Sequence, residues 1–333
     1  MIDGLATPEG TDRYRRRFPA LDAAGHFRRV DRGASVDCLW LSSIGLGTSQ
    51  GALDDAADQG YEAAIRLALV SGCNVFDTAI SYREERSERA LGRALARAFA
   101  EGIAARDEVF VVTKGGLKGE VSAGELEQSR ANLGLEAVDL YLLHNPESRL
   151  GPFPRPELEE QLGRAFADLE AAAGRGEIGI YGIATWDGLR VPPSDPGHLG
   201  LARLAAIAAS AGPRFRGVEL PLNVALPEAL VAPTQELDGV RVPALAAARK
   251  LGLTVFTSGS IQKRLGYALP SEIAQVFPDL STDAQRALQF TRSAPGVAVA
   301  LVGMGRVDHV AENLAVAAVP PAGVETFQWI FGS

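Results

Sequence analysis

The chain has 333 residues, of which 47% are apolar and 22% charged, and its formal net charge at pH 7 is −8. This acidic balance argues against a nucleic-acid partner, because phosphate binding requires clustered Lys and Arg side chains. The densest basic group, at residues 13–17, is expected to form a solvated face, as runs of like charge usually do.

The amino-terminal stretch lacks the apolar core of a secretory signal, and no apolar run approaches the ~18 residues that a bilayer-spanning helix needs. The two cysteines, Cys38 and Cys73, are too few for a disulfide framework in a chain of this length. We therefore expect a cytoplasmic protein that does not insert into a membrane.

From residue 42 onward, short apolar runs alternate with longer stretches of helical period. The runs predict strands at 42–47, 74–77, 108–113, 138–143, 176–185, 216–222, 253–258 and 296–303. The stretches between and after them predict helices at 61–70, 85–100, 124–132, 158–173, 199–209, 242–250, 282–292 and 307–316. Strands that alternate with helices imply a parallel sheet.

Eight such pairs close most economically into an α/β fold of the (β/α)8 TIM-barrel type. Runs such as 109–113 and 297–302 are apolar throughout, as expected for parallel strands covered on both faces. A doubly wound open sheet is the alternative, but no strand is followed by the Gly-x-Gly-x-x-Gly turn of the dinucleotide type.

We expect one domain over residues 1–333, with an N-terminal extension at 1–40, the barrel at 41–318 and a C-terminal tail at 319–333. The extension is expected either to plug the bottom of the barrel or to add a small hairpin. Proline-bearing segments at 146–156 and 190–196 predict long loops at the C-terminal face, where loops commonly shape a substrate pocket.

Three predicted strands end in ionisable residues, namely Asp77, Lys114 and His144, and Tyr82 follows Asp77 by five residues. In a (β/α)8 barrel the carboxyl ends of the strands open onto one face, where the chemistry collects. Each residue alone has an ordinary interpretation, since a strand-end Lys is often exposed and a lone His is more often structural. Together at one face, the four predict a proton-transfer site and hence an enzyme.

The chemistry of these four groups is complementary. A phenol with a reference pKa of about 10 is a poor acid, but a nearby ammonium stabilises the phenolate and a carboxylate keeps the ammonium charged. A histidine beside the phenol can hydrogen-bond the same substrate oxygen. Such a group can protonate a carbonyl oxygen while hydride reaches the carbon, and it needs no metal.

The segment DTAISYREERSERALGRAL at 77–95 resembles the signature of the aldo-keto reductases. IGLGT, VVTKGG, VDLYLLHNPE and LVGMGRVDHVAEN resemble further blocks of that family, in the same order, over roughly residues 40–318. The resemblance implies an NAD(P)H-dependent oxidoreductase that acts on an aldehyde, ketone or sugar carbonyl. It assigns the general acid to Tyr82, the tuning of its pKa to Lys114 and Asp77, and substrate orientation to His144.

The resemblance also implies where the cofactor, NADP with NAD as a possibility, would bind. The start of the last helix favours phosphate, and Arg306 there could meet a 2′-phosphate, with Lys263 and Arg264 as further partners. Without the other blocks, this stretch would read as an ordinary strand, turn and helix with a surface Arg. The implied cofactor contacts are Gly47, Thr48, Ser49, Asp77, Thr185, Glu219, Ser258, Gly303, Arg306, Glu312 and Asn313.

Several of these positions depart from common family patterns. Thr185 replaces Asn and Glu219 replaces Gln at the nicotinamide amide, and Ser258 replaces the Tyr that stacks on the nicotinamide ring. Gly303 and His309 replace a Lys and an Arg that clamp the 2′-phosphate in some branches, which weakens the choice of NADP over NAD.

The implied substrate pocket, lined by Ser49, Tyr82, His144, Asn145 and Trp186, is unusually polar. Ser49 and Asn145 stand where aldehyde-reducing members often carry Trp, so hydrogen-bond partners replace apolar walls. A polar or sugar-like carbonyl is therefore favoured, and Trp186 is either a remaining wall or packed core. The alternatives are an NAD-preferring sugar or polyol dehydrogenase and a non-catalytic cofactor-sensing subunit.

Overall fold

The computed structural model describes residues 1–31, 38–116, 123–150, 154–261 and 269–332. Its centre is a closed barrel of eight parallel strands in the order β11-β12-β3-β4-β5-β6-β7-β8, so the predicted (β/α)8 barrel is confirmed. The barrel strands are β3 (Ile44–Gly47), β4 (Val75–Asp77), β5 (Phe110–Gly115), β6 (Val138–His144), β7 (Ile178–Ala184), β8 (Phe215–Pro221), β11 (Thr254–Ser258) and β12 (Val297–Gly303).

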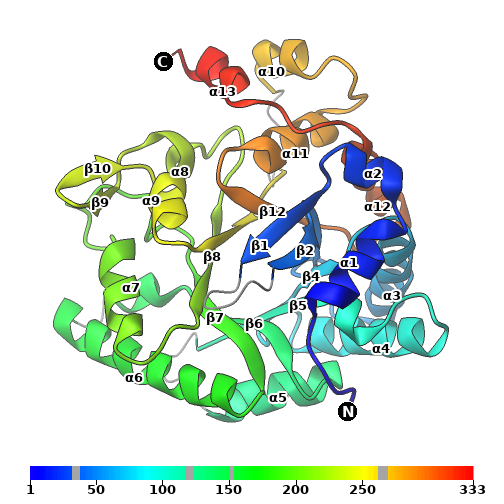
Figure 1. Ribbon diagram of the computed structural model, residues 1–333, viewed down its shortest axis with the longest axis horizontal. Helices are drawn as coiled ribbons and strands as arrows, with labels where there is room; N and C mark the ends of the chain where they lie inside the picture. Colours follow the sequence, from blue (N-terminus) through cyan, green and yellow to red (C-terminus); the bar gives the residue numbers. More distant parts are fainter. Residues whose placement is uncertain (32–37, 117–122, 151–153, 262–268, 333) are drawn as a thin grey trace.

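A layer of helices surrounds the barrel and buries an apolar layer against the outside of the strands (Figure 1). The helices that follow the eight strands are α3 (Asp55–Val70), α4 (Arg86–Ala100), α5 (Ala123–Leu133), α6 (Arg155–Gly174), α7 (Leu201–Ala209), α9 (Ala244–Lys250), α11 (Asp283–Ser293) and α12 (Val307–Leu314). Helix α3 begins six residues before the predicted start, because Asp54 caps a polar first turn by accepting a hydrogen bond from the Ala57 amide at 2.8 Å. Among the described residues, none of the helices is both long and apolar enough to cross a membrane.

The N-terminal extension forms α1 (Pro8–Arg16), α2 (Pro19–Ala23) and the first strand of an antiparallel hairpin, β1 (Phe27–Asp31) with β2 (Cys38–Ser42). Figure 1 shows this hairpin lying across the centre of the ring of helices. Leu39 and Leu41 of β2 join the cluster inside the barrel, where the rings of Phe110 and Phe256 stack with centroids 6.0 Å apart. The extension therefore contributes a hairpin and also plugs one end of the barrel.

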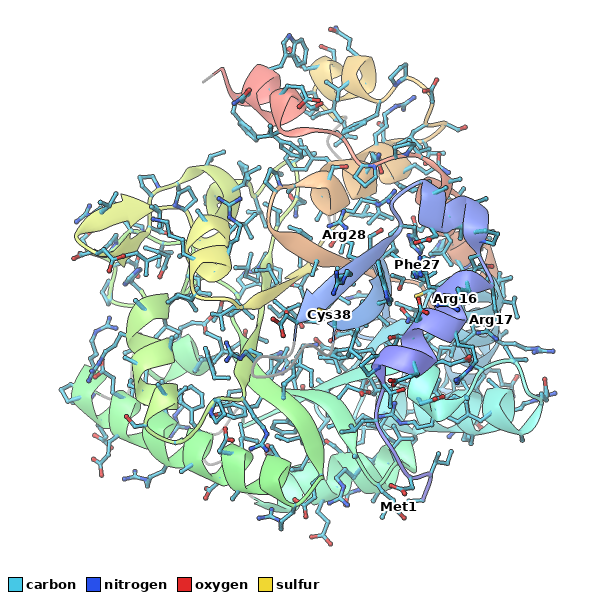
Figure 2. All side chains as sticks on the ribbon, viewed as in Figure 1. Met1, Arg16, Arg17, Phe27, Arg28 and Cys38 are labelled. Atoms are coloured by element: carbon cyan, nitrogen blue, oxygen red, sulfur yellow. The ribbon has the colours of Figure 1, made fainter. Side chains whose placement is uncertain are left out.

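The basic group at the end of α1 lies mainly on the surface. Arg16 and Arg17 are exposed (Figure 2), and Arg15 pairs with Asp12 at 2.6 Å while its guanidinium lies 4.2 Å from the centroid of the Trp40 ring. The expected solvated face is thus present, with one arginine turned onto an aromatic side chain of the hairpin.

Several short elements were not predicted, because segments this short give little periodic signal. They decorate the loops between barrel elements and the C-terminal tail. These elements are η1 (Arg106–Glu108), η2 (Pro146–Arg149), α8 (Glu228–Val231), β9 (Gln235–Leu237), β10 (Val240–Val242), α10 (Ser271–Val276), η3 (Ala315–Ala318) and α13 (Val324–Phe331).

One glycine contact is required for barrel closure between β7 and β8. A Cβ atom on Gly182 would lie 1.7 Å from the carbonyl oxygen of Gly217, so no other residue fits at position 182. The register of the two strands shifts at this point, between Tyr181 and Gly182. The approach of these two glycines lets β7 pair with β8 despite the shift.

A buried carboxylate joins the extension to the barrel at its amino-terminal end. Asp139, in β6, accepts hydrogen bonds from the amides of Ala6 at 2.6 Å and Val111 at 2.8 Å. The guanidinium of Arg106 lies 2.9 Å from the same carboxylate, and both side chains are buried. Removing one member would leave the other charge uncompensated inside the protein.

Asp139→Leu should therefore lower the free energy of unfolding by about 3–5 kcal/mol, the usual cost of breaking a buried ion pair from one side. The double variant Arg106→Met/Asp139→Leu should lose markedly less, because no unpaired charge remains. Urea unfolding followed by circular dichroism measures both. Equal losses in the single and double variants would show that the pair does not hold these elements together.

Candidate active site

The three strand-end residues singled out in the sequence, and Tyr82, meet in the structure. Asp77 is the last residue of β4 and His144 the last of β6, while Lys114 precedes the final glycine of β5. Tyr82 lies in the turn between β4 and α4. Because the strands are parallel, their carboxyl ends share one face of the barrel and bring these side chains together.

Lys114 is at the centre of the group and is fully buried. Its Nζ donates to Asp77 Oδ1 and to the Thr78 carbonyl at 3.2 Å, and it lies 3.5 Å from Tyr82 Oη. Burial lowers the pKa of Lys114, but attraction to Asp77 and Glu219 outweighs burial and the net shift is upward. Lys114 therefore stays charged at every physiological pH.

Tyr82 differs in one respect from the expectation. Burial raises the pKa of its phenol above the ordinary value, and Lys114, which lowers that pKa as expected, does not fully compensate. The phenol is therefore protonated and uncharged at neutral pH, and the neighbouring ammonium would stabilise a phenolate if the proton left.

His144 faces the phenol across the site. Its ring and that of Tyr82 meet edge to face, with centroids 5.8 Å apart and an interplanar angle of 79°. Burial first, and Lys114 second, lower the pKa of His144 to about 4, so the imidazole is neutral at pH 7. Its buried Nδ1 has no hydrogen-bond partner among the described residues, which leaves the ring free to bind a ligand oxygen.

The turn that carries Tyr82 is strained and clamped. Arg83, Glu84 and Glu85 adopt φ angles of 49°, 53° and 66°, in the left-handed region that side chains disfavour. The buried guanidinium of Arg83 holds the turn, because it donates to Asp58 Oδ1 at 2.6 Å and to the Ala52 carbonyl at 2.8 Å. This clamp was not predicted from the sequence, because charged side chains such as Arg83 are mostly exposed.

A fifth ionisable group, Glu219 of β8, also reaches the ammonium. Its Oε2 lies 3.2 Å from Lys114 Nζ, and the side chain is buried. The sequence assigned Glu219 to the cofactor amide and did not connect it with Lys114. A charged residue within the apolar run 217–222 was the available signal, but the partner depends on how far the barrel strands are staggered.

The first and last barrel strands place their implied cofactor residues side by side. Gly47 and Gly303 are register partners at the ends of β3 and β12. Thr48 is buried and both its amide and its hydroxyl donate to the Asp77 carbonyl at 3.0 Å, whereas Ser49 is exposed. Thr48 therefore holds the backbone of Asp77 in place, and Ser49 is accessible to ligands.

The residues implied at the nicotinamide amide are neighbours, because the Thr185 amide donates to the Glu219 carbonyl at 2.9 Å. Thr185 Oγ1 is buried and has no hydrogen-bond partner among the described residues. The buried Glu219 Oε2 forms the ion pair with Lys114 Nζ at 3.2 Å. A carboxamide fits this donor set, because it offers both an NH2 donor and a carbonyl acceptor. Ser258, at the end of β11, is only partly exposed.

The residues implied at the adenosine phosphate lie at the start of α12 and along it. Arg306 caps the helix; it is exposed and pairs with Asp308 through Nε and Oδ1 at 3.0 Å. Glu312 already accepts a hydrogen bond from Thr282 Oγ1 at 2.7 Å, and Asn313 is buried. Lys263 and Arg264 lie outside the described residues.

Two of the implied pocket residues follow the ends of β6 and β7, which are neighbours in the barrel. Asn145 adopts the left-handed conformation, with φ 50°, and its amide donates to the Ala184 carbonyl at 2.7 Å. Trp186 follows the end of β7 and is 41% exposed. Of the two alternatives for Trp186, packed core is therefore wrong, and a wall at the open face agrees with its position.

Fold and site together define a (β/α)8 barrel with a buried carboxylate, ammonium, phenol and imidazole at the carboxyl ends of its strands. In the described part of the chain, no cluster of three or more His, Cys, Asp or Glu side chains is arranged to hold a metal ion.

Comparisons with known proteins agree with this class. The aldo/keto reductase family model matches residues 43–191. An aldo-keto reductase of Mycobacterium avium is 35% identical over 146 residues, which cover 43% of this chain and 44% of that protein. The chain thus matches less than half the length of this curated relative.

Two solved structures show the same fold over nearly the whole chain. An aldo-keto reductase from Klebsiella pneumoniae in complex with NADPH has a TM-score of 0.64 at 22% identity, covering 91% of this chain and 93% of that one. The glycerol dehydrogenase of Gluconobacter oxydans has a TM-score of 0.67 at 18% identity, covering 93% and 95%. The family model thus supports the resemblance seen in the sequence over residues 43–191, and the relative supports it over 146 residues.

The electrostatics of His144 can be tested directly. Its imidazole should titrate at about pH 4 in an NMR pH series, and Lys114→Met should raise that midpoint, because burial remains but the cation is gone. The unfolded imidazole binds a proton near pH 6.5. His144 should therefore lower the free energy of unfolding progressively as the pH falls from about 6.5 to about 4. A midpoint near 6.5 in the folded protein would contradict the neutral donor.

Proposed function

We propose that the protein is an NADP(H)-dependent oxidoreductase that reduces an aldehyde or ketone to the alcohol. The observation that carries the proposal is the buried contact chain from Asp77 through Lys114 Nζ to Tyr82 Oη at 3.5 Å, with His144 on the other side of the phenol. The balanced reaction is carbonyl plus NADPH plus a proton, giving alcohol plus NADP⁺. A cytoplasmic location remains a prediction from the sequence.

The side chains have separate tasks in this reaction. Bound nicotinamide supplies or accepts the hydride at the carbonyl carbon. Tyr82 gives its O–H proton to the carbonyl oxygen and becomes a phenolate, which Lys114 stabilises at 3.5 Å. Asp77 keeps Lys114 in place, and the neutral His144 donates an N–H to the same oxygen. The phenolate then regains a proton from solvent.

A polar substrate suits the groups around this centre. Ser49 and Asn145 offer hydrogen-bond partners, and Trp186 offers one aromatic surface at the open face. A hydroxylated or sugar-like carbonyl is therefore part of the proposal.

NADP is proposed as the cofactor because Arg306 lies exposed at the start of α12, where a phosphate also meets the positive end of the helix. The ion pair with Asp308 competes for the same guanidinium and so weakens this preference. An NAD-preferring sugar or polyol dehydrogenase is the second candidate, favoured by this competition and by the carboxylate of Glu219 beside the implied nicotinamide site. A cofactor sensor has no need for all four proton-transfer groups.

Tyr82→Phe should reduce kcat for carbonyl reduction by ~10²–10⁴-fold, the usual loss when a general acid is removed, while NADPH binding persists. Tyr141→Phe is the matched control, because that hydroxyl is buried in the outer layer and has no hydrogen-bond partner among the described residues. Steady-state kinetics and fluorescence titration with NADPH provide the two readouts. Unchanged turnover in Tyr82→Phe would remove the phenol from the mechanism.

Arg306→Ala should weaken NADPH binding roughly tenfold and leave NADH binding nearly unchanged, since only NADPH carries the 2′-phosphate. Asp308→Asn should act in the opposite direction, because it frees the guanidinium and removes a negative charge near the phosphate. Fluorescence titrations of wild type and both variants with each cofactor measure these changes. Equal losses for the two cofactors in Arg306→Ala would reject a 2′-phosphate contact, and a wild type that prefers NADH would favour the dehydrogenase.

A further inference from the structure

Two buried carboxylates share one buried ammonium at the centre of the site. Lys114 Nζ donates to Asp77 Oδ1 and lies 3.2 Å from Glu219 Oε2, and each carboxylate residue is only 4% exposed. Lys114 also contacts the Thr78 carbonyl and Tyr82, so its donors are already distributed. Asp77 makes the closer contact, which leaves Glu219 as the carboxylate in excess.

The charges of the surrounding groups do not neutralise this excess. The ionisable groups that face the cluster are Asp77 on β4, Tyr82 in the turn after β4, Lys114 on β5 and His144 on β6. The neighbouring ends of β7 and β11 present Thr185 and Ser258, which carry no charge. With Tyr82 and His144 neutral, ionisation of both carboxylates gives the cluster one net negative charge.

A carboxylate in this position is sensitive to any cation that enters the site. Burial first, and the charge of Asp77 second, raise the pKa of Glu219 above its ordinary value, and Lys114 opposes them. Glu219 thus holds a proton to higher pH than an exposed glutamate does. A new positive charge nearby would favour the ionised form and expel that proton.

The hydride-exchanging group must come close to Glu219. Tyr82 Oη, which contacts the substrate oxygen in the proposed reaction, is 3.5 Å from Lys114 Nζ, itself 3.2 Å from Glu219 Oε2. A hydrogen bond from Tyr82 to the substrate oxygen spans about 2.7 Å, the C=O bond about 1.2 Å and the approach of the reacting atoms ~3–3.5 Å, so the reacting carbon of a bound nicotinamide lies within about 14 Å of the carboxylate. The nicotinamide ring is a cation when oxidised and neutral when reduced, so Glu219 can distinguish the two forms by charge.

We propose that Glu219 is a specificity-determining residue that makes the site favour the oxidised, cationic nicotinamide over the reduced, neutral one. On binding of the oxidised cofactor, the O–H bond of the Glu219 carboxyl breaks and the proton passes to solvent, without any transfer of electrons. The inference rests on the proposed function, because it requires a nicotinamide at this site. It predicts that rising pH shifts the enzyme toward alcohol oxidation.

The experiment is isothermal titration calorimetry of the full chain with NADP⁺ and with NADPH, from about pH 6 to about pH 9, in two buffers of different ionisation enthalpy. Wild type should release up to about one proton per NADP⁺ bound while Glu219 is protonated, and none with NADPH. The ratio of the Kd for NADPH to the Kd for NADP⁺ should rise roughly tenfold as the pH increases and Glu219 ionises. The 2′-phosphate is common to both cofactors and cancels in this ratio.

Glu219→Gln is the decisive variant, because it keeps the size and polarity of the side chain and removes the charge. It should release no proton with NADP⁺, and its ratio of the Kd for NADPH to the Kd for NADP⁺ should not change with pH. Glu88→Gln is the matched control, since Glu88 is also a buried carboxyl but accepts from Thr113 Oγ1 at 2.6 Å on the outer side of the barrel. It should retain the wild-type proton release.

The outcomes separate the inference from the proposed function. If wild type binds both cofactors, releases no proton and shows a ratio of Kd values that does not change with pH, the role of Glu219 is overturned. The proposed oxidoreductase function is then unaffected. The same holds if Glu219→Gln keeps the wild-type pH dependence. A wild type that binds neither cofactor overturns both. If Glu219→Gln fails to bind NADPH, the presence or absence of proton release when wild type binds NADP⁺ still tests the inference.

Discussion

The buried ammonium of Lys114 is the constraint on which the rest of the site depends. An isolated charge inside a protein is so unfavourable that it neutralises or finds partners, and Lys114 finds them on three other strands or turns. Asp77 makes the direct contact, Glu219 lies 3.2 Å away and Tyr82 lies 3.5 Å away. Asp77 and Glu219 are positioned by backbone pairing in the barrel and Tyr82 by the turn after β4, so much of the geometry of the site follows from the register of the strands.

Packing at the opposite end of the barrel helps to keep the site around Lys114 buried. The hairpin of the N-terminal extension seals that end with Leu39 and Leu41, and the stacked rings of Phe110 and Phe256 fill the interior. The ionisable residues at the open end thus lie above a packed apolar core. The same burial raises the pKa of Tyr82 and lowers that of His144, so both groups are uncharged hydrogen donors at neutral pH. A wetter barrel would let both groups ionise more readily and would weaken the pairing around Lys114.

The sequence predicted most of the fold because parallel barrel strands leave a strong signal. The apolar runs at 109–113 and 297–302 fall within or beside β5 and β12, and the helical stretches coincide with the outer layer. The strand ends also predicted the meeting of Asp77, Lys114 and His144, because their position follows from topology alone. The contact between Glu219 and Lys114 does not follow from topology alone, since it depends on the stagger between strands that are three places apart in the barrel. Elements such as α8 and the β9–β10 hairpin are too short to show a period.

Two residues whose contacts the sequence analysis did not predict, Arg83 and Glu219, are both charged side chains buried next to the proposed reacting groups. Composition favours the surface for such residues, and burying them costs stability unless they are paired. The turn at Arg83 adds backbone strain, at roughly 1–2 kcal/mol for each left-handed residue that is not glycine. The contacts of Arg83 with Asp58 and the Ala52 carbonyl offset that strain and fix the entry of α4, so the phenol of Tyr82 cannot drift from Lys114. At these two positions the site requires a charge or a conformation that a stable fold would otherwise avoid, and surrounding contacts supply the compensation.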